Sequence, residues 1–266
     1  MVESDIRGLE AEGVSVAFGG LLALDHVSLN VTEGEVVGVI GPNGAGKTTL
    51  FNVMCGFVRP DSGRMLLNGR ELRRLRPHQL PGLGVSRTMQ AVGLWPGLTV
   101  RENVMTGAQV KSRSGFGHAL AGLFRSADDE RSLADRAMAI LAELDAADVA
   151  DRYPTTLPYP IQKRVALARA LVSDPKLLLL DEPASGLSDA DMASLGALIR
   201  QLTGRMGVLL VEHHMDLVMD VCDRLVVLDF GKVIAAGAPA DVRDNPAVAA
   251  AYLGEDVDRE AGGPDA

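Results

Sequence analysis

The stretch from residue 41 to residue 49 reads Gly-Pro-Asn-Gly-Ala-Gly-Lys-Thr-Thr and fits the pattern G-x-x-x-x-G-K-[ST]. Glycines in such a loop allow successive backbone N–H groups to turn towards phosphate oxygens. Lys47 supplies a positive charge for the β- and γ-phosphates of a nucleotide, and the Thr48 hydroxyl is a ligand for Mg²⁺. The pattern therefore predicts a nucleoside triphosphate site made by Gly41, Asn43, Gly44, Ala45, Gly46, Lys47, Thr48 and Thr49.

The alternative to a nucleotide site is a glycine-rich turn that contains a lysine by chance, and the sequence on either side of the motif helps to decide between the two. The apolar run 36–40 (Val-Val-Gly-Val-Ile) indicates a strand that leads into the loop. Apolar positions resume at Leu50, Phe51 and Val53, which indicates a helix that begins inside the motif. Because the N-terminus of a helix attracts phosphate, this order of strand, loop and helix favours the nucleotide site.

Two adjacent carboxylates, Asp181 and Glu182, follow the apolar run 177–180. Ligands in open α/β folds bind at the carboxyl ends of such strands. Asp181 is suited to hold Mg²⁺, directly or through its water, and Glu182 to orient and deprotonate an attacking water. The alternative is an acidic pair that caps the helix after Pro183. The phosphate loop elsewhere in the chain favours the catalytic interpretation.

The sequence Glu212-His213-His214 follows another apolar run, 208–211, so an imidazole is expected at the same edge of the sheet. His213 is suited to hydrogen-bond a γ-phosphate oxygen and to sense its loss. The alternative is a solvated histidine at the start of a helix. We expect His214 to be structural or exposed.

The chain changes character twice along its length. Residues 14–65 read as short strands broken by turns, and about 91–172 as a mostly helical insertion with a helix over 128–144. From residue 177, apolar runs alternate with amphipathic helices at 189–203 and 215–222, which predicts a parallel α/β sheet.

Composition narrows the class of protein. The 266 residues are 47% hydrophobic and 23% charged, which is globular, and the net charge of −9 argues against a nucleic-acid binder. Cys55 and Cys222 lack metal or redox spacing and are expected to be reduced core residues. The polar, acidic N-terminus lacks secretory features, so we expect a cytoplasmic chain that acts on a membrane only through a partner. The acidic tail 255–266 is expected to be disordered.

Over residues 8–254, these motifs resemble the ATP-binding subunit of an ABC transporter, specifically the larger ATPase subunit of branched-chain amino acid importers. The resemblance implies an ABC-type P-loop NTPase fold of the α/β class, with an N-terminal antiparallel β subdomain and an inserted helical subdomain. It implies that Phe18 stacks on adenine, that Gln90 contacts Mg²⁺ and the attacking water, and that His213 is the switch histidine. Taken alone, Phe18 reads equally as a core aromatic.

The family pattern also assigns residues 91–104, which include Trp95, to a groove that receives a helix from a membrane subunit. Trp95 is the only tryptophan of the chain. From sequence alone, a place in the core is nearly as well supported as a place on a docking surface.

Two positions depart from the family. Residues 157–162 read Leu-Pro-Tyr-Pro-Ile-Gln, where the family has a signature loop of the type L-S-G-G-Q or L-P-Y-G-Q. Ser188 stands where the family often has Asp or Asn after Gly-Leu. Because each composite site joins one subunit's phosphate loop to the other's signature loop, a homodimer would have the altered loop in both sites.

The sequence therefore predicts an ATPase with ATP and Mg²⁺ as cofactors, bound peripherally at the cytoplasmic face of the plasma membrane. Its expected partners are a second, distinct ABC ATPase subunit, membrane permease subunits and, indirectly, a solute-binding protein. Branched-chain amino acids, other amino acids, amides and urea all remain open as solutes. The alternatives are a non-transport cytosolic ABC ATPase and an ATP-binding regulatory subunit with low turnover.

Overall fold

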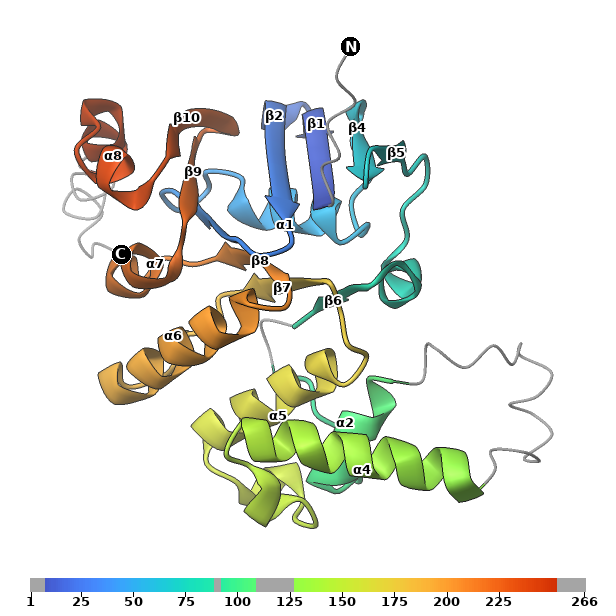
Figure 1. Cartoon of the computed structure of the whole chain (residues 1–266). Helices are drawn as coiled ribbons and strands as arrows, with labels where there is room; N and C mark the ends of the chain where they lie inside the picture. Colours follow the sequence, from blue (N-terminus) through green and yellow to red (C-terminus); the bar gives the residue numbers. More distant parts are fainter. Residues whose placement is uncertain (1–7, 89–91, 109–126, 253–266) are drawn as a thin grey trace, which may run out of the picture. The chain divides into compact units, whose positions relative to one another are not determined.

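The computed structural model describes residues 8–88, 92–108 and 127–252 (Figure 1). They fall into two compact units, the first built from residues up to 78 and from 179 onward, the second from 79–178. The expected helical insertion of about 91–172 falls within the second unit, which is wider. The division of the chain into one domain over 8–254 and a disordered tail stays a prediction. Gln90, Ala91 and residues 255–266 lie outside the described residues.

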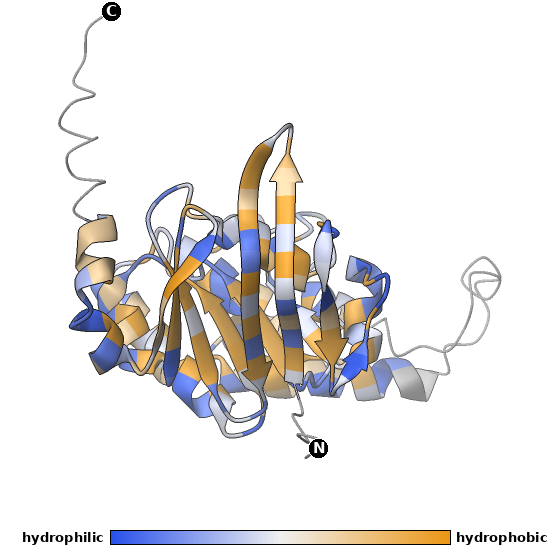
Figure 2. Cartoon of the chain, turned by 90° about the horizontal axis from the view of Figure 1, so that it is seen from above, coloured by the Kyte–Doolittle hydropathy of each residue, from blue (hydrophilic) through white to orange (hydrophobic). Residues whose placement is uncertain are grey.

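An antiparallel sheet of the first unit has the strand order β2-β1-β4-β5. Its strands are β1 (Gly8–Phe18), β2 (Leu21–Thr32), β4 (Ser62–Leu67) and β5 (Arg70–Glu71). β1 begins at Gly8, before the first expected strand at residue 14, because Gly13, with φ +58°, is accommodated at a register shift within one continuous strand. Figure 2 shows hydrophobic residues along this hairpin up to its tip, where Phe18 pairs with Leu21.

The other sheet is predominantly parallel and has the order β10-β9-β3-β8-β7 in the first unit. Its strands are β3 (Val36–Ile40), β7 (Leu177–Asp181), β8 (Gly207–Val211), β9 (Arg224–Asp229) and β10 (Lys232–Gly237). β3 runs parallel to β8 and β9, as predicted, and β10 runs antiparallel to β9. All five residues of β3 and of β8 are buried, because an inner strand of such a sheet is covered on both faces.

Helices of the first unit begin close to the expected positions, except for α8, which was not predicted. They are α1 (Lys47–Met54), α6 (Asp189–Thr203), α7 (Met215–Val221) and α8 (Pro239–Arg243). α6 buries Gly196, Ile199 and Leu202, which lie three residues apart on one face. Ser188 caps this helix, since its hydroxyl accepts from the Asp191 amide at 3.3 Å.

The second unit is mostly helical. It contains α2 (Val100–Thr106), α4 (Ala127–Glu143) and α5 (Tyr159–Leu171), the short strand β6 (Val85–Arg87) and the 3₁₀ turns Ala147–Val149 and Pro154–Thr156; a further 3₁₀ turn, Pro77–Leu83, leads into it. Thr99 and Glu102 form a capping box at the start of α2. The Gly84 carbonyl accepts from the amides of Lys176 and Leu177 at 2.7 and 3.2 Å, so β6 begins beside the first residue of β7.

Both cysteines are free and buried, as predicted. Burial raises the pKa of the Cys222 thiol to about 12, and the negative charge of Asp223 adds to the effect. Gly38 leaves room for this thiol, because a Cβ at that position would lie 2.7 Å from Cys222 Sγ. Among the described residues, no helix has the length and apolar character needed to cross a bilayer.

Candidate functional site

The phosphate loop lies between β3 and α1, and its glycines are required by backbone conformation. Gly41 and Gly46 have φ values of +148° and +102°, in the region that favours glycine. A Cβ at Gly46 would also lie 2.6 Å from the Ala23 carbonyl of β2. Gly46 is the N-cap of α1, which begins at Lys47, so the helix does start inside the motif as predicted.

Lys47 has a buried side chain that turns back over the loop. Its Nζ donates to the carbonyls of Gly41 at 2.6 Å and Pro42 at 2.7 Å. Asn43, Gly44 and Thr48 are exposed, whereas Ala45 is buried. The amide of Gly231, in the turn between β9 and β10, donates to the Ala45 carbonyl at 3.0 Å and ties the loop to the sheet. The ammonium group and the helix N-terminus thus supply positive charge at one place.

Phe18 is 52% exposed at the tip of the β1–β2 hairpin, so the core alternative for this residue is wrong. Its partner strand begins at Leu21 and passes the phosphate loop at Ala23, whose carbonyl lies against Gly46. An exposed aromatic on a hairpin whose second strand contacts a phosphate loop is suited to pack on a nucleobase.

Asp181 is the last residue of β7, and Glu182 follows it with an unusual backbone conformation. The φ of Glu182 is +44°, a value that costs a non-glycine residue about 1 kcal/mol or more and often occurs at functional sites. The Glu182 amide donates to the Val211 carbonyl, at the end of β8, at 2.8 Å. Its side chain is 25% exposed, which leaves the carboxylate accessible to water.

His213 lies near Glu182 although 31 positions separate them in the sequence. The Nδ1 atom of His213 is 3.9 Å from Oε1 of Glu182 and 3.7 Å from Oε2 of Glu212. The side chain of His213 is 53% exposed, so its ring can reach a ligand. The structure therefore brings together the two groups predicted at the ends of β7 and β8.

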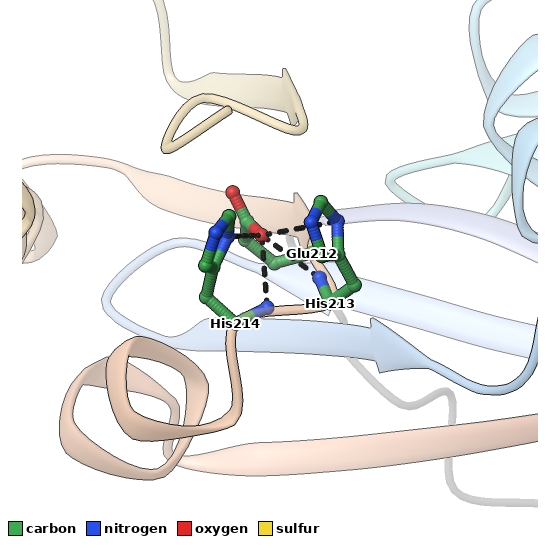
Figure 3. A group of neighbouring side chains, drawn as sticks. All are labelled: Glu212, His213 and His214. Atoms are coloured by element: carbon green, nitrogen blue, oxygen red, sulfur yellow. Dashed lines mark hydrogen bonds and ion pairs between the residues drawn. The ribbon is translucent and has the colours of Figure 1, made fainter. Parts of the chain in front are cut away.

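Glu212 is a residue that sequence analysis did not single out. Its side chain is fully buried and its two oxygens accept four hydrogen bonds. Figure 3 shows those from His213 and His214. Oε1 accepts from the Ala184 amide at 2.8 Å; Oε2 accepts from the amides of His213 at 2.8 Å and His214 at 3.1 Å, and from His214 Nδ1 at 2.8 Å. Burial alone would raise the pKa of this carboxyl, but the four donors outweigh it and hold the pKa below its usual range.

His214 is structural, as one of the two expectations had it. It begins α7 as the N-cap residue, but its ring bonds Glu212 instead of capping the helix. The rings of His213 and His214 are 4.2 Å apart between centroids. The sequence signal that could have identified this cluster is the position of Glu212 directly after the apolar strand β8. A glutamate at such a position is buried only when hydrogen-bond or ionic partners surround it.

The altered signature segment lies at the start of α5 in the second unit. Pro158 is the N-cap of this helix and provides no capping side chain, and Pro160 lies in the first turn, where it has no N–H. The Gln162 side chain donates to the Leu157 carbonyl at 2.9 Å. Nearby in this unit, Trp95 is 61% exposed, which excludes the core alternative for its side chain.

Comparison with known proteins gives consistent matches. The family model described as "ABC transporter" matches residues 24–185, and the model "Branched-chain amino acid ATP-binding cassette transporter" matches residues 232–258. The high-affinity branched-chain amino acid transport ATP-binding protein BraF of Pseudomonas aeruginosa is 42% identical, over 93% of this chain and 98% of its own length. LivG of Salmonella typhimurium, described in the same words, is 41% identical over the same shares.

Solved structures agree with these matches. The ADP conformation of MJ1267, an ATP-binding cassette of an ABC transporter, superposes with a TM-score of 0.80 at 30% identity, over 93% of this chain and 98% of that one. A nucleotide-free ATP-binding cassette from an ABC transporter also has a TM-score of 0.80, at 30% identity, over 92% and 98%.

Proposed function

The chain belongs to the ABC transporter family as one of its ATP-binding, ATP-hydrolysing subunits, and on that premise we propose that it powers the import of branched-chain or related amino acids. The names of the similar proteins and the match of residues 232–258 support this class of solute. The structural observation that supports hydrolysis most directly is the pairing of Glu182 and His213 at 3.9 Å, in the sheet whose central strand leads to the phosphate loop.

We propose the following division of roles among the site residues. The loop from Gly41 to Thr49 binds the phosphates, with Lys47 as the positive charge, and Phe18 packs on the adenine. Glu182 orients the attacking water and accepts its proton, and His213 hydrogen-bonds the γ-phosphate. Gln90 completes the set as a contact to the attacking water.

Thr48 and Asp181, with Gln90, are proposed to hold Mg²⁺. The Thr48 hydroxyl is exposed on the loop, and Asp181 ends β7 directly before Glu182. Hydroxyl, carboxylate and amide oxygens are the ligands that Mg²⁺ prefers, so the donors present fit this ion. The ion would neutralise charge on the phosphate oxygens when bound.

The proposed assembly contains a second, distinct ABC ATPase subunit and membrane permease subunits, with a solute-binding protein acting indirectly. The two prolines at the start of α5 support a distinct ATPase partner, because a homodimer would have the altered loop in both of its sites. The exposed Trp95 supports a docking surface for a permease helix. The assembly would place this chain at the cytoplasmic face of the plasma membrane.

A second candidate is an ATP-binding regulatory subunit with low turnover. The missing donors at Pro158 and Pro160 favour it, whereas the pairing of Glu182 with His213 favours a working hydrolytic site. A non-transport cytosolic ABC ATPase is the remaining alternative, and the exposed tryptophan argues against it.

The nucleotide site is tested by Lys47→Ala, measured as the affinity of the purified chain for a fluorescent ATP analogue. The loss of one charged hydrogen-bond donor is worth ~1.5–3 kcal/mol, so affinity should fall roughly 10- to 100-fold. Lys176→Ala removes another lysine, exposed and in the second unit, and should leave the affinity unchanged. Equal affinity for Lys47→Ala and wild type would reject the phosphate-loop assignment.

A further inference from the structure

Glu212 connects two segments that carry the proposed chemistry. Through Oε1 it accepts from Ala184, two residues beyond Glu182. Through Oε2 it accepts from the backbone of His213 and His214. One carboxylate thus joins the segment after β7 to the segment after β8, across 28 positions of sequence.

Backbone hydrogen bonds also hold Glu182 itself at this edge of the sheet. Its amide bonds Val211 at 2.8 Å, and its own carbonyl accepts from Ser185 at 3.2 Å. Glu182 also has a left-handed backbone conformation, which persists only where neighbouring structure fixes it. The bond from Ala184 to Glu212 supplies such a restraint two residues after Glu182.

We propose that Glu212, with His214 as its side-chain partner, is a positioning residue for ATP hydrolysis that sets the location of Glu182 relative to His213. The proposal rests on the proposed function. Glu212 has no contact with the phosphate loop among the hydrogen bonds and ion pairs of the described residues. We therefore expect it to act on turnover and to leave ATP binding nearly unchanged.

The donors around Glu212 require a carboxylate and not an amide. Three of its partners are backbone N–H groups, which can only donate, and they approach both oxygens. A glutamine has one oxygen and one NH₂ group, so in either orientation a donor would face a donor. Glu212→Gln keeps the shape of the side chain but must break the link to Ala184 or the link to His213 and His214.

The four hydrogen bonds that Glu212 accepts also favour a positioning role over metal binding. Ligand atoms of Glu212, His213 and His214 lie within 4.8 Å of one another, a spacing that a cation could use. A metal at this place would have to displace donors from a carboxylate that already accepts four hydrogen bonds. We therefore assign Glu212 an anchoring role.

The first test is steady-state ATP hydrolysis by the transporter complex purified with Glu212→Gln in this chain. We expect kcat to fall roughly 10- to 100-fold, the scale of one misplaced charged hydrogen bond, with KM for ATP changed less than about twofold. The matched control is Glu35→Gln. Glu35, like Glu212, is a carboxylate of the first unit that accepts several hydrogen bonds, here from Thr32 and Arg224. It is only partly buried and lies at the end of β3 away from the phosphate loop. This control should reduce thermal stability and leave kcat near the wild-type value.

A double-mutant cycle with His213→Ala distinguishes positioning from general destabilisation. If Glu212 acts by fixing Glu182 relative to His213, the loss in kcat caused by Glu212→Gln should be clearly smaller in the His213→Ala background than in the wild-type background. Full additivity of the two losses would overturn the proposal. A wild-type complex that binds no ATP would instead refute the proposed function, so the two failures can be told apart.

His214 provides a variant that tests the proposal even if Glu212→Gln does not fold. His214→Asn retains a short side chain with a donor for Glu212, whereas His214→Leu removes the donor. We expect His214→Leu to reduce kcat several-fold and His214→Asn to restore most of it, at unchanged KM. Equal kcat values for both variants and wild type would contradict a role for His214.

Discussion

At the scale of single residues, some groups of the site are positioned by the local sequence and others by strands that are distant in the sequence. Lys47 and the loop glycines could be predicted from sequence, because a loop of fixed length between a strand and a helix positions them locally. The hydrogen-bond partners of Glu212 could not, because the donor Ala184 lies 28 positions away and only the pairing order of β7 and β8 brings the two residues together. Gln90 lies outside the described residues, so its role stays a prediction.

The catalytic assignment of Glu182 is tested by Glu182→Gln. The variant should bind ATP with wild-type affinity and hydrolyse it roughly 10²-fold more slowly or worse, because a positioned base is lost. With Mg-ATP and its partner ATPase, it should accumulate as a closed dimer in size-exclusion chromatography. Glu71→Gln, in the exposed strand β5, is the control and should hydrolyse ATP normally. Wild-type turnover of Glu182→Gln without a gain in dimer would count against Glu182 as the base.

Glu212 also predicts how stability depends on pH. Its pKa in the folded chain lies below the usual range, so the unfolded chain binds this proton more readily than the folded one. The stabilisation is therefore present above the usual carboxyl pKa and is lost as pH falls through the lower, folded-state value. The difference in Tm between wild type and Glu212→Gln should stay nearly constant from pH 7 down to the usual carboxyl pKa of about 4.3 and should shrink as the pH is lowered further. A difference that grows over this range would contradict the assignment.

At the scale of elements, the periodic helices and the inner strands were predictable, because burial on one or both faces fixes their patterns. The limits of α6 and of β3 agree with the predictions. The length of β1 was not predictable, because Gly13 reads as a strand end but is accommodated within the pairing. The solvent exposure of Trp95 could not be predicted either, because the side chain of Asn103 fixes the backbone of the loop before α2.

Trp95 and Asn103 make a matched pair for testing the proposed docking surface. Asn103 is buried, and its side chain bonds the backbone N–H and carbonyl of Trp95 and the carbonyls of Leu98 and Thr99. Trp95→Ala leaves these backbone bonds intact, so it should weaken assembly with the membrane subunits while the isolated chain keeps its Tm.

Asn103→Ala should instead destabilise the isolated chain by roughly 2–4 kcal/mol, because it leaves buried backbone groups without partners. Denaturant unfolding of both variants, with pull-down of the permease subunits, makes the comparison. A loss of ~3–5 kcal/mol on Trp95→Ala, typical of an emptied core aromatic, would reject the docking role.

At the scale of the whole molecule, the altered loop at the start of α5 predicts unequal sites in the proposed dimer with a different ATPase. Pro158 lacks the hydroxyl and N–H of a serine, and Pro160 lacks the N–H of a glycine. Two missing donors at ~1.5–3 kcal/mol each correspond to roughly 3–6 kcal/mol, or 10²–10⁴ in rate. The site that combines this chain's Lys47 and Glu182 with the partner's signature loop should therefore carry most of the hydrolysis.

This asymmetry is measurable in the assembled heterodimer. Glu182→Gln in this chain should abolish most ATPase activity, and the equivalent change in the partner should cost little. Equal losses from the two changes would refute the asymmetric model. Negligible activity of the wild-type heterodimer would favour the regulatory alternative.

The two buried cysteines give the native chain a practical property for spectroscopy. Burial raises the pKa of the Cys222 thiol to about 12, so this thiol stays protonated near neutral pH and reacts poorly with thiol reagents. Cys55 is equally shielded from reagents in solution. Maleimide fluorophores or spin labels should therefore attach only to cysteines introduced at exposed positions, such as Phe230 in the turn beside the phosphate loop or Trp95 in the second unit. Distance changes during the ATP cycle could then be followed in a chain that retains both native thiols.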